Sequence, residues 1–342
     1  MKLKINKITG SILAVIAAIA IISAMFVSGE FVRGDADTDI KVDKGDGTII
    51  IADKLKEKNV ISSTAAFRIY STLSGKNGKW QPGTFSVKQG ENLVSLSKTL
   101  TSLHHNEVKV LIPEGKQARQ IAEILEKKGV CSADEFISAC VNNKFDYPFL
   151  KGVNTKKRIS GLEGYLFCDT YYFEKSEDVN DVINTMLSRF QEKVYTDEIR
   201  SMVKGTRYSF DEIIILSSIV ESEATTKEDR RTVAGVFLNR LEKRKHGKLQ
   251  SCVTVEYAKG IKKHVISFED TKFKSPYNTY LHEGLPYGPI SCPSLESINA
   301  VLKPIKNNYY YFQSDSHGKL YFAETYEEHM RLQEEIHKKW NK

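Results

Sequence analysis

A glutamate near the end of an apolar helix is the residue of this sequence best suited to chemistry. The run from Ile213 to Ala224 places isoleucine, leucine and valine almost all the way round a predicted helix and reaches Glu221 near its end. Ser209 and Glu212 fit a capping box at the start of this helix. Because a helix that is apolar on every side is normally buried, we expect Glu221 to enter an apolar environment, which favours the protonated carboxyl that a general acid needs. The alternative is that Glu221 points into solvent from the helix end.

Glu223 is the second carboxylate of the same segment. On a continuing helix it points about 160° away from Glu221, because each residue turns the helix by about 100°. The two side chains therefore cannot face one cleft. Since Glu221 follows the buried face, we predict that Glu221 is the catalytic residue and treat Glu223 as its competitor.

Side chains of the kind that bind saccharides occur further along the chain. Tyr277, Asn278, Thr279 and Tyr280 combine aromatic faces with amide and hydroxyl groups, and the alternative for them is a rigid structural loop. Gln250 lies in a predicted turn that suits contact with a sugar.

Two residues of the helix predicted near 228–244 are further candidates. Asn239 lies beside Phe237 and Leu241, where it either contacts substrate or serves as a structural amide satisfied by the backbone. Arg240 suits a carboxylate of the substrate, with a surface salt bridge as the more common alternative.

The elements that position these residues belong to a chain of 342 residues, which is enough for two or three domains. The net charge of +7 suits an anionic membrane surface or polymer, but no basic stripe interleaved with aromatic residues indicates binding to nucleic acid. No cysteine pair has metal-ligand spacing with histidines nearby, so we expect no metal and no cofactor. Five cysteines outside the membrane leave at least one thiol unpaired or intermolecular.

The N-terminus predicts a membrane anchor. Three lysines in residues 1–7 precede an uncharged run at 8–29 that is long enough to span a bilayer, which needs roughly 20 apolar residues. The lysines predict a cytoplasmic N-terminus, and the remainder of the chain then lies outside the cytoplasm. A cleaved signal peptide is the alternative, but the charged linker at 30–40 lacks a convincing small-residue cleavage site.

An internal repeat follows the linker at an offset of 70 residues. Val42-Asp43-Lys44-Gly45 and the helix-like run 51–60 recur as Ile112-Pro113-Glu114-Gly115 and the run 121–130. Each copy predicts a strand, a turn at glycine, an amphipathic helix and a second helix.

The order of predicted elements indicates an α+β fold with three folded parts. We predict a small β-α-α-β subdomain at 41–103, a second repeat with connecting elements at 104–205, and a mixed α+β catalytic domain at 206–342. The subdomain at 41–103 resembles LysM-type modules, which hold N-acetylglucosamine polymers, and a plain spacer domain is the alternative.

Five groups of residues, in this order and spacing, resemble the YceG-like family of endolytic murein transglycosylases. They are Leu162-Glu163-Gly164-Tyr165, Ser218-Ile219-Val220-Glu221, Val236-Phe237-Leu238-Asn239-Arg240-Leu241, Ser275-Pro276-Tyr277-Asn278-Thr279-Tyr280 and Phe322-Ala323-Glu324-Thr325. The resemblance implies a single-pass membrane protein that cleaves the β-1,4 bond between N-acetylmuramic acid and N-acetylglucosamine of nascent peptidoglycan and leaves 1,6-anhydro-muramyl ends. It also implies that Glu221 acts first as acid and then as base, and it suggests peptidoglycan synthases as partners.

The chain departs from the family pattern at four positions. Cys168 and Tyr287 stand where proline is usual, and Cys252-Val253 replaces an Asp-Pro pair after Gln250. The altered segment leaves a second hypothesis open, namely a divergent protein with little or no activity that binds peptidoglycan and scaffolds wall-synthesis enzymes. A solute-binding lipoprotein is excluded because no lipobox cysteine follows the apolar run.

Overall fold

The structure is a computed structural model that describes residues 37–88, 91–102, 107–243, 247–262 and 266–340. The fold is α+β, as predicted, with short two-stranded sheets among many helices. The described residues fall into two compact units, one ending at Val108 and the other beginning at Lys109. The cytoplasmic tail and the membrane helix predicted at 8–29 lie outside the described residues. Among the residues that are described, no helix is both long and apolar enough to cross a membrane.

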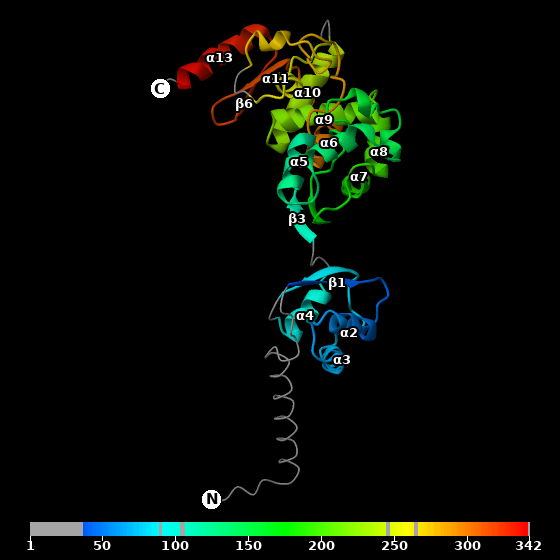
Figure 1. Cartoon of the computed structure of the whole chain (residues 1–342). Coiled ribbons are helices and arrows are strands. Elements are labelled where there is room, and N and C mark those ends of the chain that lie inside the picture. Colours follow the sequence, from blue (N-terminus) through cyan, green and yellow to red (C-terminus); the bar gives the residue numbers. More distant parts are fainter. Residues whose placement is uncertain (1–36, 89–90, 103–106, 244–246, 263–265, 341–342) are drawn as a thin grey trace, which may run out of the picture. The chain divides into compact units, whose positions relative to one another are not determined.

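The first unit has the β-α-α-β order predicted for this part of the chain, followed by one more helix (Figure 1). Its elements are β1 (Thr38–Val42), α2 (Thr48–Glu57), α3 (Thr64–Leu73), β2 (Gly83–Val87) and α4 (Leu93–Leu100). Strands β1 and β2 pair antiparallel, with Ile40 opposite Phe85. Both side chains enter a buried core that also holds Leu55 and Phe67, and Trp80 stacks on Phe67 with ring centroids 5.2 Å apart.

The second copy of the repeat starts the second unit and confirms the predicted strand-turn-helix-helix order. Its elements are β3 (Glu107–Leu111), α5 (Ala118–Lys127) and α6 (Ala133–Asn142). In each copy the turn glycine has a positive φ, +98° at Gly45 and +72° at Gly115, a conformation that favours glycine. The strand partners differ, because β3 pairs with β4 (Thr170–Glu174), which lies beyond the repeat.

The remainder of the second unit is mainly helical. It contains α7 (Val179–Lys193), α8 (Asp197–Lys204), α9 (Phe210–Glu223), α10 (Lys227–Lys243), α11 (Cys252–Lys259), α12 (Leu295–Leu302), β5 (Tyr311–Ser314), β6 (Leu320–Ala323) and α13 (Tyr326–Trp340). Three single-turn 3-10 helices lie at Pro148–Leu150, Thr155–Lys157 and Asp270–Lys272. The structure groups the predicted parts 104–205 and 206–342 in this one compact unit, apart from the residues before Lys109.

Helix α9 is the buried centre of this unit. The capping box predicted at Ser209 and Glu212 is present, with both side chains bonded to backbone N–H groups. Every residue from Ile213 to Val220 is buried, as the apolar pattern predicts, and α9 packs against α10, α11 and α12. The position of Glu221 is therefore fixed by three neighbouring helices.

Candidate active site

The carboxylate of Glu221 lies in a polar socket formed by α10 and the start of α12. Arg230 Nη2 donates to Oε1 at 2.9 Å. The backbone N–H of Ser294 donates to Oε2 at 2.9 Å, and the hydroxyls of Ser294 and Ser297 donate to the same oxygen at 2.5 and 2.7 Å. The Glu221 side chain is only 5% exposed. The expectation of an apolar environment is thus wrong, because the helix ends two residues later, at Glu223, and its last side chains meet polar groups. The alternative of a side chain in open solvent is wrong as well.

The start of α12 explains why this socket accepts a carboxylate. Ser294 is the N-cap of α12, and its hydroxyl accepts a hydrogen bond from the N–H of Ser297. The first N–H groups of a helix lack partners within the helix and carry partial positive charge. Glu221 accepts one of them and also binds the two serine hydroxyls, so α12 and Glu221 fix one another.

Arg230 links Glu221 to a second carboxylate. Its Nη1 donates to Glu296 at 2.7 Å while Nη2 holds Glu221, and the Arg230 side chain is 10% exposed. A guanidinium presents donors in a rigid fork, so it fixes the direction of both carboxylates. Only three residues separate α9 from α10, which is why Arg230 comes so close to the end of α9.

The loop of the second repeat copy lies against Glu221. The N–H of Gly115 donates to the carbonyl of Cys292, and the N–H of Cys292 donates to the carbonyl of Lys116, both at 2.9 Å. This pairing joins the loop to the segment that leads into α12. A Cβ atom added at Gly115 would lie 3.5 Å from Glu221 Cγ. The positive φ therefore explains glycine here, and an added Cβ would contact Glu221 at an ordinary van der Waals distance.

A cleft of about 670 Å³ opens beside this socket. Ser222 and Ser291, the neighbours in sequence of Glu221 and Cys292, line it together with Glu114 and Glu256. Its wall also carries Lys116, Arg119, Lys259 and Lys262. Hydroxyl, carboxylate and ammonium groups on one wall provide both donors and acceptors for the hydroxyl and amide groups of a sugar polymer.

Glu223 occupies a different site from Glu221, as the helix geometry predicts. Its Oε1 accepts a hydrogen bond from the hydroxyl of Ser251 at 2.6 Å. Burial raises the pKa of Glu223, and the neighbouring Arg240 opposes that shift. Glu223 is not among the residues that line the cleft.

Three of the predicted substrate-binding residues use their polar side chains inside the protein. Asn239 Nδ2 donates to the carbonyls of Asn307 and Tyr309, each at 3.0 Å. Asn278 Nδ2 donates to backbone carbonyls of the preceding turn, and the Thr279 hydroxyl accepts the N–H of Ser251. All three are buried, which favours the structural alternatives for Asn239 and for the loop 277–280.

The other predicted substrate-binding residues lie in two places, with Tyr280 against Cys252 and Tyr277 packed on Tyr257. The Tyr280 hydroxyl lies 3.1 Å from Cys252 Sγ, and Gln250, with φ +50°, bonds through its N–H to the carbonyl of Thr279. Tyr277 is 1% exposed, and burial raises the pKa of its hydroxyl to about 12. The altered Cys252-Val253 segment thus contributes Val253 to the cleft wall, while its cysteine faces Tyr280.

Arg240 is a structural residue. It donates to the carbonyls of Tyr310 and Leu249 and lies over the rings of Phe237 and Phe312. At 6% exposure its guanidinium is held inside the protein, which favours a structural role over a salt bridge on the surface. All five cysteines are free thiols.

Sequence reasoning missed most of the groups that hold Glu221. Arg230 follows it by nine residues, but Ser294 and Ser297 are 73 and 76 residues away along the chain. The sequence does show a serine at an N-cap position, with a second serine three residues later. This pattern indicates the start of a helix and does not identify either serine as a partner of Glu221. Gly115 was recognised as a turn residue, without any sign of what it approaches.

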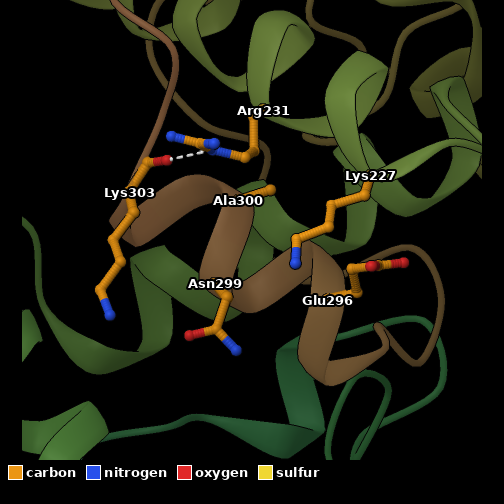
Figure 2. A pocket seen from close by; sticks show the side chains of 6 residues that line it. All are labelled: Lys227, Arg231, Glu296, Asn299, Ala300 and Lys303. Carbon is orange, nitrogen blue, oxygen red and sulfur yellow. Dashed lines mark hydrogen bonds between the residues drawn. The ribbon is translucent and has the colours of Figure 1, made fainter.

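A second hollow of about 530 Å³ lies between α10 and α12. Figure 2 shows Lys227 and Arg231 projecting from α10 toward α12, which carries Glu296 and Asn299. Arg231 Nε donates to the carbonyl of Lys303 at 2.9 Å. Glu296 lines this hollow and also pairs with Arg230, so the guanidinium of Arg230 bridges Glu296 and Glu221. Within the described part of the chain, no group of three or more histidine, cysteine or acidic side chains is arranged to hold a metal ion.

Comparison with known proteins gives consistent matches along most of the chain. Residues 40–335 match the model of the YceG-like family. The chain is 33% identical over 330 residues to the endolytic murein transglycosylase of Bacillus subtilis (strain 168), a match that spans 92% of this chain and 90% of that protein. It is 32% identical over 254 residues to the endolytic murein transglycosylase of Streptococcus pneumoniae serotype 2, covering 67% of this chain and 45% of that protein. The crystal structure of a YceG-like protein from Listeria monocytogenes superimposes with a TM-score of 0.59 at 28% identity, over 87% of this chain and 100% of that one.

Proposed function

The chain belongs to the YceG-like family, and we propose that it is an endolytic murein transglycosylase that cleaves the glycan strands of peptidoglycan. The bond cut is the β-1,4 bond between N-acetylmuramic acid and N-acetylglucosamine, and the product carries a 1,6-anhydro-muramyl end. The single observation that best supports a catalytic site is the carboxylate of Glu221, fixed by four hydrogen bonds beside a polar cleft.

One proton-exchanging carboxyl group is enough for this reaction. Ordinary glycosidases need two carboxyl groups, because one of them acts as nucleophile or activates water. In a lytic transglycosylase the C6 hydroxyl of the muramyl residue is the nucleophile. Glu221 protonates the leaving oxygen as the C1–O4 bond breaks, and its carboxylate then takes the C6 hydroxyl proton as the C1–O6 bond forms.

Glu221 must gain its proton in a socket that contains Arg230. The hydroxyls of Ser294 and Ser297 are free to rotate and can accept as well as donate, whereas Arg230 can only donate. We propose that substrate entering the cleft weakens the contact between Arg230 and Glu221, while Glu296 keeps the guanidinium in place. The groups around Glu221 can then hydrogen-bond both its carboxylate and its protonated carboxyl group.

The remaining parts of the chain fit a protein that works at the outer face of the membrane. We propose that residues 8–29 anchor it with the N-terminus in the cytoplasm, so that both units lie outside the cytoplasm. The β-α-α-β order of the first unit supports a LysM-like role in holding glycan strands, and peptidoglycan synthases are the proposed protein partners.

The alternative is a divergent binding protein without activity, suggested by the altered Cys252-Val253 segment. The contact between Cys252 and Tyr280 supports the enzyme instead, because the replaced residue does not touch the socket of Glu221. Only Val253 borders the cleft.

The test is the product formed from peptidoglycan. Full-length protein in detergent is incubated with purified strands, and the products are analysed by mass spectrometry for 1,6-anhydro-muramyl ends. We expect such ends with the unaltered chain and a loss of about 100-fold or more in their rate of formation with Glu221→Gln.

Two results would contradict this proposal in different ways. No anhydro ends with the unaltered chain would favour the binding protein. Ends that persist at the full rate in Glu221→Gln but vanish in Glu223→Gln would move the catalytic role to Glu223. Thermal unfolding of each variant shows whether it is folded.

A further inference from the structure

A second carboxylate reaches the cleft from the loop that covers Glu221. Glu114 immediately precedes Gly115, the residue whose added Cβ would lie 3.5 Å from Glu221 Cγ. The two backbone hydrogen bonds between this loop and Cys292 hold it in place. Because these hydrogen bonds fix the backbone that follows Glu114, the Cα atom of Glu114 has a defined position next to the socket.

Glu114 differs from Glu221 in its partners. Within the described residues the Glu114 carboxylate makes neither a hydrogen bond nor an ion pair, and it lines the cleft with Ser222 and Ser291. Glu221, by contrast, accepts four hydrogen bonds and is almost fully enclosed. Glu114 is exposed, so its carboxylate, without a hydrogen-bond partner in the described part of the chain, is available to whatever enters the cleft.

The charges around Glu114 come from every element that meets at the socket. Burial raises the pKa of Glu114, and the carboxylates of Glu221 on α9 and Glu296 on α12 raise it further. Arg230 on α10 acts in the opposite direction. The thiol of Cys168 is also within electrostatic range of both Glu114 and Glu221. Glu114 therefore belongs electrostatically to the same site as Glu221.

We propose that Glu114 is a second catalytic group, whose carboxylate stabilises the positive charge that develops on the muramyl ring. This inference rests on the proposed function. As Glu221 donates its proton to the leaving oxygen and the C1–O4 bond breaks, positive charge spreads over C1 and the ring oxygen, and the Glu114 carboxylate opposes it. Glu221 then accepts the C6 hydroxyl proton while O6 bonds to C1. Glu114 stays ionised throughout, and no water, oxidant or further reactant is consumed.

The proposed division of roles follows from what each carboxylate can do. A fixed negative charge in a cleft stabilises a developing cation without having to reorganise during the reaction. Glu221, which has rotatable hydroxyl partners, is suited to gain and lose a proton. Glu114, whose carboxylate accepts no hydrogen bond from the described residues, is suited to remain an ionised group next to the substrate.

Two variants of the second unit test this role. Glu135 is an exposed carboxylate on α6 that does not line the cleft, so Glu135→Gln is the matched control for Glu114→Gln. We expect Glu114→Gln to lower kcat by about 50-fold or more, with KM changed less than about threefold, and Glu135→Gln to leave kcat within about twofold of the unaltered enzyme. The assay follows initial rates of anhydro-end formation across strand concentrations.

The pH profile gives a second readout that a structural role would not change. On the acid side, protonation of Glu114 removes its charge, so kcat of the unaltered enzyme falls as pH decreases. Glu114→Gln has no charge to lose, so this acid limb disappears and the low rate becomes flat. Glu114→Asp retains the charge and should recover part of the rate.

The failures of the two proposals are distinguishable. If the unaltered chain forms anhydro ends and Glu114→Gln matches it in kcat or keeps the same acid limb, only the role of Glu114 is overturned. If the unaltered chain forms no anhydro ends, the proposed function fails first. A normal unfolding temperature for Glu114→Gln confirms that any loss of rate belongs to the site.

Discussion

The two copies of the repeat have the same local structure and very different surroundings. After β1, the loop carries Lys44 and Gly45, and a Cβ added at Gly45 would meet nothing within 4 Å. After β3, the corresponding loop carries Glu114 and Gly115 and lies against Glu221. The same turn is a surface feature in one copy and part of the candidate active site in the other. The repeat therefore supplies a backbone scaffold, whereas the elements packed on it determine its chemistry.

The neighbours of the two copies account for this difference. Strand β1 pairs with β2 inside its own unit, and Lys54 of α2 binds Asp43 and Asp46 of the loop at 2.7 and 2.6 Å. Strand β3 instead pairs with β4. At the start of α5, the N–H of Ala118 donates to the buried carboxylate of Glu163 at 2.9 Å. The strand and loop of the first copy therefore find their partners within the first unit, whereas those of the second copy pair with residues far along the chain.

The largest expected effect comes from removing the same core leucine in each copy. Leu55 and Leu125 occupy matching positions on α2 and α5, and both are fully buried. Each change to alanine should cost about 2–5 kcal/mol of unfolding free energy. We expect Leu125→Ala to lower the rate of anhydro-end formation as well, because α5 carries cleft residues, and Leu55→Ala to leave that rate within about twofold at a temperature where both are folded.

Calorimetry and the product assay together check this expectation. Leu55→Ala should lower the unfolding temperature of the first unit alone, and Leu125→Ala that of the second. Equal losses of activity in both variants would contradict the separation of the two copies.

An intermediate effect is expected from the buried carboxyl that only the second copy uses. Burial raises the pKa of Glu163 to about 8 from an ordinary value of 4.5. The native state therefore binds this proton more tightly than the unfolded chain, and stability falls as pH rises between about 4.5 and 8, by up to about 1.4 kcal/mol per pH unit. Glu163→Gln should remove this slope, because an amide does not titrate in this pH range. The variant should still fold, because the amide oxygen can accept from the N–H of Ala118 and the amide nitrogen can donate to the hydroxyl of Tyr257.

Urea unfolding at several pH values measures the slope, with Glu123→Gln as the control on the same unit. An unchanged slope in Glu163→Gln would show that the proton is bound elsewhere.

The stability of the first unit should depend on pH in the opposite direction. Lys54 lowers the pKa of Asp43 and of Asp46, so the stability that they contribute is present above about 3.8 and is lost as pH falls.

The smallest expected effect comes from exchanging the two turn glycines for alanine. Both have positive φ, so Gly45→Ala and Gly115→Ala should each cost about 1 kcal/mol of stability through backbone strain. Only at Gly115 does the added methyl group meet Glu221, and only that variant should lower kcat, by several-fold. Thermal unfolding measures the loss of stability in each variant, and initial rates measure the loss of kcat. A rate loss in Gly45→Ala as large as that in Gly115→Ala would show that the glycine turns influence activity without the contact to Glu221.

Local features of this protein were predictable because each depends on residues within a few positions of one another. The capping box of α9, the buried run 213–220 and the 70-residue repeat all follow from spacing along the chain. The opposite directions of Glu221 and Glu223 follow from helix geometry in the same way. Asn239 and Asn278 could not be assigned by type alone, because an amide that binds sugar and one that binds backbone look identical in sequence.

The family, the helix that carries Glu221 and the glycine turn of each repeat copy can be read from the order of residues alone. The polar socket of Glu221, the approach of Ser294 and Ser297 across more than 70 residues, and the position of Glu114 in the cleft beside that socket depend on how the chain packs. A helix is specified by contacts three and four residues apart, whereas the hydrogen bonds of a buried carboxylate are made with whichever donors the packing of distant helices brings within 3 Å.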